Sequence, residues 1–235
     1  AAYERLTSIL SDPDECGMSA LDCIYEIMEN EVQRRDSNAL ARRLKEAKIC
    51  LPNARPDTID FSIERGLDKN KIDALLTMRW MEEHQNIIIT GAAGCGKTFL
   101  ACALVNQACI KGRTARVVRV PLLLNQMAAS HQIVETYFKK LKEMKTIDLL
   151  VLDDWGIGQL DARSRQDLLE IINERYMYAS TIVTSVLPVN KWSEYINDTT
   201  YSDAILDRLV SVSHRVELNG ASVRQMKEYG AVLKE

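Results

Sequence analysis

Apolar and polar residues follow a helical rhythm through the first part of the chain. From residue 19 to residue 48, apolar side chains recur every three or four residues or at multiples of that spacing, which predicts one long helix. The positions that carry this pattern are Leu21, Ile24, Met28, Val32, Leu40, Leu44 and Ala47. Pro52 and Pro56 cannot continue a helix, so residues 49–67 are predicted to form an irregular linker.

Beyond the linker, short aliphatic and β-branched runs alternate with helical patterns. The predicted strands are residues 86–90, 113–120, 148–154, 181–186 and 214–218. The predicted helices are residues 68–83, 97–111, 121–145 (in two pieces), 162–179, 189–196 and 201–212. Strands that alternate with helices predict an α/β fold with a parallel five-stranded sheet covered on both faces. We expect this α/β domain to span residues 66–235, preceded by a helical N-terminal domain and linker over residues 1–65.

Composition narrows the class of protein. The chain has 235 residues, of which 46% are hydrophobic and 27% are charged, as is typical of globular proteins. The net charge of −3 means that any binding of nucleic acid must come from local basic patches. No apolar run approaches the ~20 residues that span a bilayer, and the first residues lack the layout of a signal peptide, so we expect no membrane partner.

The cysteines indicate a reduced protein. None of the six forms a CxxC pair and the histidines are distant from them in sequence, which disfavours both a metal site and a disulfide framework. We therefore expect a cytoplasmic location. Cys102 and Cys109 are seven residues apart in a helical pattern, and we expect both to be buried as small hydrophobic residues. Cys95 is interpreted as a tolerated small residue, with redox sensing as the alternative.

A glycine-rich sequence, GAAGCGKT, lies between the first predicted strand and the following helix, which is the context that a phosphate-binding P-loop requires. Glycines let the backbone curl around an anion, and N–H groups at the start of a helix attract phosphate. Lys97 is predicted to reach the β- and γ-phosphates of a nucleoside triphosphate such as ATP, and the Thr98 hydroxyl is predicted to ligate Mg²⁺. The residues predicted to bind the nucleotide here are Gly91, Ala92, Ala93, Gly94, Cys95, Gly96, Lys97, Thr98 and Phe99.

Acidic and hydroxyl side chains end two further strands. The sequence LLVLDD places Asp153 and Asp154 at the carboxyl edge of the sheet, where ligands bind in open α/β folds. We expect Asp153 to hold Mg²⁺ and Asp154 to act as general base on the attacking water, the alternative being an acidic strand cap. At the end of the next strand, Thr184 or Ser185 is a candidate sensor of the γ-phosphate; both hydroxyls would otherwise satisfy backbone groups.

Three late arginines are candidates for a residue that completes the site. In oligomeric P-loop ATPases, an arginine from a neighbouring subunit stabilises the charge of the γ-phosphate. Arg208 lies on a predicted helix, Arg224 follows the last strand, and Arg175 is a third candidate. Asp207 leaves a surface ion pair with Arg208 as the alternative.

Two basic stretches are candidates for contact with DNA phosphates. The first, residues 34–48, contains Arg34, Arg35, Arg42, Arg43, Lys45 and Lys48. The second, residues 111–119, contains Lys111, Arg113, Arg116 and Arg119 without an acid. Contacts of this kind depend on salt and tolerate any base sequence. The alternative for each stretch is a solvated surface.

Several strings in this order resemble the IstB family, the ATP-binding helpers of insertion-sequence transposases, which belong to the AAA+ group beside the DnaC helicase loaders. The strings are RRLKEAK, EHQNIIITGAAGCGKTFLACAL, LLVLDDWG, TIVTSVLPVNKW and DAILDRLV. The resemblance implies an AAA+ core that hydrolyses ATP, assembles on duplex DNA as a homo-oligomer, remodels or bends that DNA and recruits a transposase.

By matched position, the resemblance implies a role for each candidate residue. Lys97 and Thr98 would bind the nucleotide and Mg²⁺, and Asp153 would bind the metal. Asp154 would be the catalytic acidic residue. Arg208 would be the finger that acts on a neighbouring subunit, and Arg224 the second sensor.

Two positions depart from the AAA+ pattern. Asp154 stands where glutamate is usual, and a shift of about 1 Å in a reacting group costs roughly 10²-fold in rate. Val186 stands where a sensor asparagine is common. Both changes predict slow hydrolysis suited to a switch. Two other functions stay open, a DnaC-like replicative helicase loader and a metabolic P-loop kinase.

Overall fold

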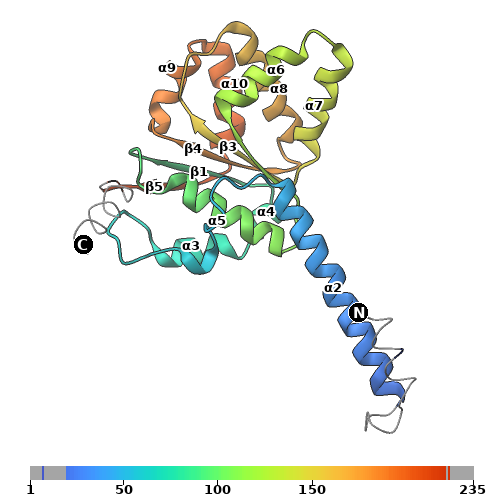
Figure 1. The fold of residues 1–235 in the computed structure, drawn as a ribbon. Helices are drawn as coiled ribbons and strands as arrows, with labels where there is room; N and C mark the ends of the chain where they lie inside the picture. Colours follow the sequence, from blue (N-terminus) through green and yellow to red (C-terminus); the bar gives the residue numbers. More distant parts are fainter. Residues whose placement is uncertain (1–6, 8–19, 221, 223–235) are drawn as a thin grey trace, which may run out of the picture. The chain divides into compact units, whose positions relative to one another are not determined.

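The structure is a computed structural model that describes residue 7, residues 20–220 and residue 222 (Figure 1). The chain divides into two compact units, Ala1–Arg43 and Leu44–Glu235. No helix among these described residues is both long enough and apolar enough to pass through a bilayer.

The first unit contains most of the long helix α2 (Ala20–Glu46), as the apolar periodicity predicted. The apolar side chains of its first turns are exposed, namely Leu21, Ile24, Tyr25, Met28 and Val32. Glu31 pairs with both Arg34 and Arg35 at 2.9 Å, and hydrogen bonds from these arginines lower its pKa to about 2. Two cations of the first basic stretch are thus bound to a neighbour on their own helix.

The second unit is built on a five-stranded sheet in which every recorded strand pair is parallel, which confirms the predicted fold class. Its strands are β1 (Asn86–Gly91), β2 (Ala115–Arg119), β3 (Leu149–Trp155), β4 (Ser180–Ser185) and β5 (Ser213–Leu218). Their spatial order is β2-β3-β4-β1-β5, so the P-loop strand β1 lies between β4 and β5. β4 is buried along its whole length, as expected for a strand covered on both faces.

Helices cover both faces of the sheet (Figure 1). One face packs against α5 (Lys97–Ile110), and α3 (Lys69–Leu76) packs on α5. Across the sheet lie α6 (Val120–Ser130), α7 (Val134–Thr146), α8 (Ala162–Arg175), α9 (Trp192–Ile196) and α10 (Thr199–Val210). The region predicted as a single helix, residues 68–83, is two helices, because Met78 adopts a left-handed φ of 66° between α3 and α4 (Arg79–Glu82).

Small side chains allow α5 to pack close to the sheet. Ala101, Ala103 and Ala108 are fully buried on this helix, together with Cys102 and Cys109. The prediction that these two cysteines are buried is therefore confirmed.

The segment before the sheet belongs to the compact α/β unit. The Ala47 carbonyl accepts a hydrogen bond from the Val117 amide at 2.9 Å, so the chain that leaves α2 pairs with the edge strand β2. Ala54 and Ile59 are buried, and the short 3-10 helix Pro56–Thr58 packs on α5. This unit begins at Leu44, earlier than the boundary at residue 66 expected from the sequence. The segment contains one short 3-10 helix and local turns, so it has no periodic pattern, and its place in the unit comes from its packing on α5 and β2.

Candidate nucleotide site

The P-loop curls between β1 and α5 in a backbone conformation that requires glycine. Gly91 has a φ of 149°, and a Cβ atom there would lie 2.2 Å from the Leu218 carbonyl oxygen. Gly96, with a φ of 102°, is the N-cap of α5, and a Cβ atom there would lie 2.5 Å from a guanidinium nitrogen of Arg65. The loop is thus closely enclosed by β5 and by the segment before the sheet.

Lys97 begins α5 and is nearly buried, with 9% of its surface exposed. Its Nζ atom donates hydrogen bonds to the carbonyl oxygens of Gly91 and Ala92, each at 2.8 Å. No carboxylate pairs with this ammonium among the described residues. The charge is therefore held over the loop by neutral acceptors and remains available to an anion.

Two hydroxyl groups converge on the first acid of β3. Thr98 Oγ1 donates a hydrogen bond to Asp153 Oδ1 at 2.9 Å, and the Thr184 hydroxyl donates to the same oxygen. Neighbouring ligands in a Mg²⁺ octahedron, each roughly 2.1 Å from the ion, lie about 3 Å apart. The Thr98 and Asp153 oxygens have that spacing and the oxygen chemistry that Mg²⁺ prefers, so this pair fits the metal.

The second acid lies at an irregularity of the strand. The register of β3 on β4 shifts between Leu152 and Trp155, and Asp154 has a left-handed φ of 63°. A bulge of this kind re-aims a side chain. Here the carboxylate of Asp154 meets Arg119, whose Nε atom lies 2.6 Å from Oδ2. The structure thus places the candidate general base in an ion pair that the sequence did not predict.

The hydroxyls at the end of β4 have different partners. Thr184, 1% exposed, donates to Asp153 and accepts from the Asp154 amide at 3.3 Å, so it orients the acids. Ser185 donates to the Trp155 carbonyl at 2.8 Å and accepts from the Leu187 amide, so it satisfies backbone groups, as its alternative interpretation held.

A cavity of about 280 Å³ opens beside the P-loop. Its walls come from the loop and the start of α5, and from the segment before the sheet. The P-loop side supplies Gly94, Gly96, Lys97, Thr98 and Phe99. The other side supplies Leu51, Thr58, Asp60, Ile63 and Arg65, none of which the sequence singled out. That segment has no motif and no periodicity, so only its packing on α5 reveals it.

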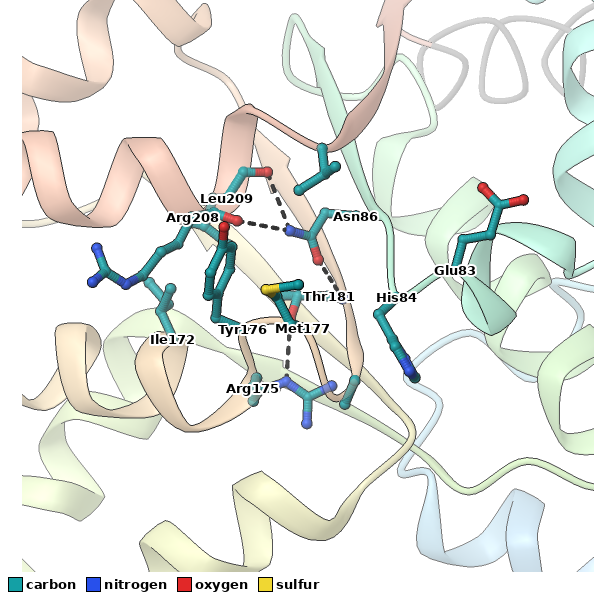
Figure 2. Close-up of a pocket in the computed structure, with 12 residues that line it drawn as sticks. Glu83, His84, Asn86, Ile172, Arg175, Tyr176, Met177, Thr181, Arg208 and Leu209 are labelled. Atoms are coloured by element: carbon teal, nitrogen blue, oxygen red, sulfur yellow. Dashed lines mark hydrogen bonds between the residues drawn. The ribbon is translucent and has the colours of Figure 1, made fainter.

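Arg208 lies at the edge where the parallel strands begin, opposite the edge that carries the P-loop. It lines a cavity of about 150 Å³ there (Figure 2). The Asn86 side chain, at the first residue of β1, donates to the Arg208 carbonyl at 3.1 Å. The P-loop follows the last residue of β1, and this six-residue strand spans roughly 16 Å. Arg208 therefore lies far from the P-loop of its own chain.

Arg175 is unsuited to the role of finger, and this alternative is wrong. The side chain is 2% exposed, and its guanidinium donates to the carbonyls of Met144, Ile147 and Ser180 and to the Thr181 hydroxyl. Burial lowers its pKa to about 9. In Figure 2 it is one of the residues that line the cavity, hydrogen-bonded to Thr181. Arg175 is a structural residue that joins α8 to the starts of two strands. The other candidate, Arg224, lies outside the described residues.

Residues of both basic stretches line a third cavity, of about 350 Å³, beside the edge strand β2. Four cations line it, with Glu143 as the single carboxylate of the lining. They are Lys48, Arg116, Arg119 and Lys140. Arg116 pairs with Glu143 at 2.8 Å and Arg119 with Asp154. We call this group the basic pocket. It brings together one residue of the first stretch, two of the second and one that the sequence did not indicate.

Comparison with known proteins gives a consistent family. The family described as IstB-like ATP binding protein matches residues 2–231. An insertion-sequence ATP-binding protein of Sinorhizobium fredii is 39% identical over 222 residues, which cover 94% of this chain and 90% of that protein. The insertion sequence IS21 ATP-binding protein of Pseudomonas aeruginosa is 29% identical over 94% of this chain and 82% of its own length.

Solved structures share the fold at lower identity. DnaI aligns with a TM-score of 0.60 at 20% identity, covering 77% of this chain and 98% of that one. DnaA of Aquifex aeolicus, solved with AMPPCP bound, aligns with a TM-score of 0.60 at 22% identity, covering 78% of this chain and 56% of that one. These likenesses extend to the AAA+ fold alone.

Proposed function

The chain belongs to the IstB-like ATP binding proteins, and from this premise we propose that it is an ATP-dependent helper of DNA transposition. In this proposal the protein binds and hydrolyses ATP with Mg²⁺ and assembles as a homo-oligomer on duplex DNA. The assembly remodels or bends the DNA and recruits a transposase. The observation that supports DNA binding is the basic pocket beside β2, the edge strand of the second unit.

Hydrolysis follows from the groups around the P-loop. Lys97 balances charge on the β- and γ-phosphates, while Thr98 and Asp153 hold Mg²⁺, which neutralises charge on the phosphate oxygens. Asp154 polarises the attacking water as general base. Its pairing with Arg119 and the apolar Val186, the residue after β4, support slow turnover, as suits a switch.

Assembly follows from the position of Arg208. An arginine at the far edge of the sheet serves an ATP site only when a second subunit brings its own P-loop to that edge. Complete ATP sites would then form between subunits, and nucleotide would link neighbouring copies. A second sensor role for Arg224 stays a proposal from the resemblance.

DNA binding follows from charge. The whole chain carries a net charge of −3, yet four cations face one carboxylate in the basic pocket. Cations clustered in this way release counterions from DNA phosphates and bind without regard to base sequence. Arg119 belongs to this pocket and also pairs with Asp154, so DNA and the ATP site share one residue.

The test is assembly on DNA with ATP. Wild-type protein, incubated with ATP, Mg²⁺ and duplex DNA of arbitrary sequence at low salt, should form large complexes in electron microscopy and sedimentation. Complexes should weaken steeply as salt rises. Protein that stays monomeric would contradict the proposal. A preference for single strands, together with binding to a replicative helicase, would instead favour a helicase loader.

Two charge reversals locate the DNA contact. Lys48→Glu and Lys140→Glu are expected to weaken duplex binding at least tenfold, because each places an acid in the basic pocket. Lys139→Glu alters the same helix outside this lining and is the matched control, with a smaller loss. Equal losses of affinity in all three variants would mean that binding depends only on the overall charge of the protein and not on the basic pocket.

A further inference from the structure

We propose that Arg65 is a second cation of the ATP site, which binds the phosphate chain of the nucleotide from within the same subunit. This inference rests on nucleotide binding at the P-loop, and it names a residue outside every motif of the sequence. Arg65 lines the cavity beside the P-loop together with Gly94, Gly96 and Lys97.

Arg65 is a buried charge without an anionic partner. Only 5% of the surface of Arg65 is exposed. Nη1 donates to the Cys95 carbonyl at 3.3 Å and Nη2 to the Asp60 carbonyl at 3.0 Å, while Nε has no hydrogen-bond partner. No carboxylate pairs with the guanidinium among the described residues. A buried charge is costly unless it is paired, so this position favours binding of an anion.

Arg175 is the matched contrast within the same chain. It is equally buried, but four hydrogen bonds use its guanidinium, and neither the cavity beside the P-loop nor the basic pocket includes it. An arginine used only for packing has its donors satisfied by the protein. Arg65 has two recorded bonds, to neutral acceptors, and keeps donors for a ligand.

The backbone fixes Arg65 against the loop. The Asn219 amide donates to the Arg65 carbonyl at 2.8 Å, which joins this residue to the end of β5. Glycine at position 96 admits the guanidinium, because a Cβ atom there would lie 2.5 Å from Nη1. The guanidinium is therefore held beside the P-loop N–H groups that receive phosphate, and its planar fork matches phosphate oxygens.

The experiment measures competition against a fluorescent ATP analogue by ATP and by inorganic tripolyphosphate, which carries the phosphate chain alone. In Arg65→Met, which keeps an apolar stem without charge, we expect the Kd of both competitors to rise about tenfold or more. Arg55→Met is the control, because Arg55 lies in the same segment, is exposed and pairs with Asp57. Its affinities should stay unchanged.

Thermal unfolding without nucleotide separates binding from packing. Because Arg65 is an unpaired buried charge, Arg65→Met should unfold at the wild-type temperature or above it. A large fall in Tm together with unchanged tripolyphosphate affinity would overturn the proposal and make Arg65 a packing residue. So would unchanged affinity for ATP.

A second neutral variant keeps the test decisive should Arg65→Met fold poorly. Arg65→Gln retains hydrogen-bond donors and lacks the charge, so it should lose tripolyphosphate affinity to a similar extent. Wild-type affinity in Arg65→Gln would overturn the role of the charge. Wild-type protein that failed to bind the ATP analogue would contradict the nucleotide site itself, whereas failure to assemble on DNA would leave this result standing.

Discussion

Arg119 Nε lies 2.6 Å from Asp154 Oδ2, so an arginine at the end of the edge strand holds the candidate general base. The hydrogen bond to Asp154 raises the pKa of Arg119 above its ordinary value. A carboxylate in this pair cannot orient water freely. The Arg119 side chain is mostly exposed and solvent screens an exposed ion pair, so another anion can displace the Asp154 carboxylate from it.

Release of this pair should speed hydrolysis. Arg119→Gln frees the Asp154 carboxylate, and we expect ATP turnover without DNA to rise by up to about fivefold, a modest gain because solvent already screens this exposed pair. Duplex binding should weaken, because Arg119 also lines the basic pocket. Phosphate release and fluorescence anisotropy measure the two effects. Arg113→Gln, at an exposed arginine before the same strand, should change turnover little. A fall in turnover would show that Arg119 positions Asp154 for catalysis.

The role of Asp154 as general base can be tested by changing the charge of its side chain and, separately, its length. Asp154→Asn keeps the size of the side chain and removes the base, so phosphate release should fall about 10²-fold or more while ATP affinity is kept. Asp154→Glu adds the methylene group that the AAA+ pattern usually has at this position, and turnover should rise about tenfold. Slower turnover in the glutamate variant would mean that the left-handed backbone at this position is adapted to aspartate.

Arg208 should act between subunits. Arg208→Ala is expected to leave ATP affinity of isolated subunits unchanged and to lower turnover of the DNA-bound assembly about 10³-fold, as for other arginine fingers. Mixing Arg208→Ala with Asp154→Asn subunits should restore part of the activity. In such a mixture the intact Asp154 of an Arg208→Ala subunit meets the intact Arg208 of an Asp154→Asn subunit. Absence of rescue would contradict action in trans.

Arg175 should affect stability rather than chemistry. Arg175→Ala leaves four buried acceptors without their donor, so the free energy of unfolding should fall by about 3 kcal/mol or more in urea titrations. Arg163→Ala, at an exposed position of the same helix, should change it by about 0.5 kcal/mol or less. Equal stability of the two variants would contradict the structural role.

Local spacing was sufficient to predict the sheet and the position of the P-loop between β1 and α5. Short apolar runs identify the inner strands β1, β3 and β4, because strands covered on both faces expose few positions, whereas the edge strands β2 and β5 alternate buried with more exposed residues. The order of strand, glycine loop and helix identifies Gly91 to Thr98 in the same way, since loop and helix are neighbours in sequence. Even Thr98 and Asp153, which are 55 residues apart, were predicted to meet, because parallel strands end at one edge.

Only the tertiary structure decided the roles of charged residues, because their partners are distant in the sequence. The sequence by itself established a P-loop on a five-stranded parallel sheet and proposed both Arg175 and Arg208 as fingers. Folding buried Arg175, left Arg208 at the far edge, paired Arg119 with Asp154 and placed Arg65 against the P-loop. The residues next to each of these arginines in the sequence do not distinguish a buried structural role from a role at the ATP site. Its long side chain takes its role from groups brought near by the fold, and neither period nor motif encodes them.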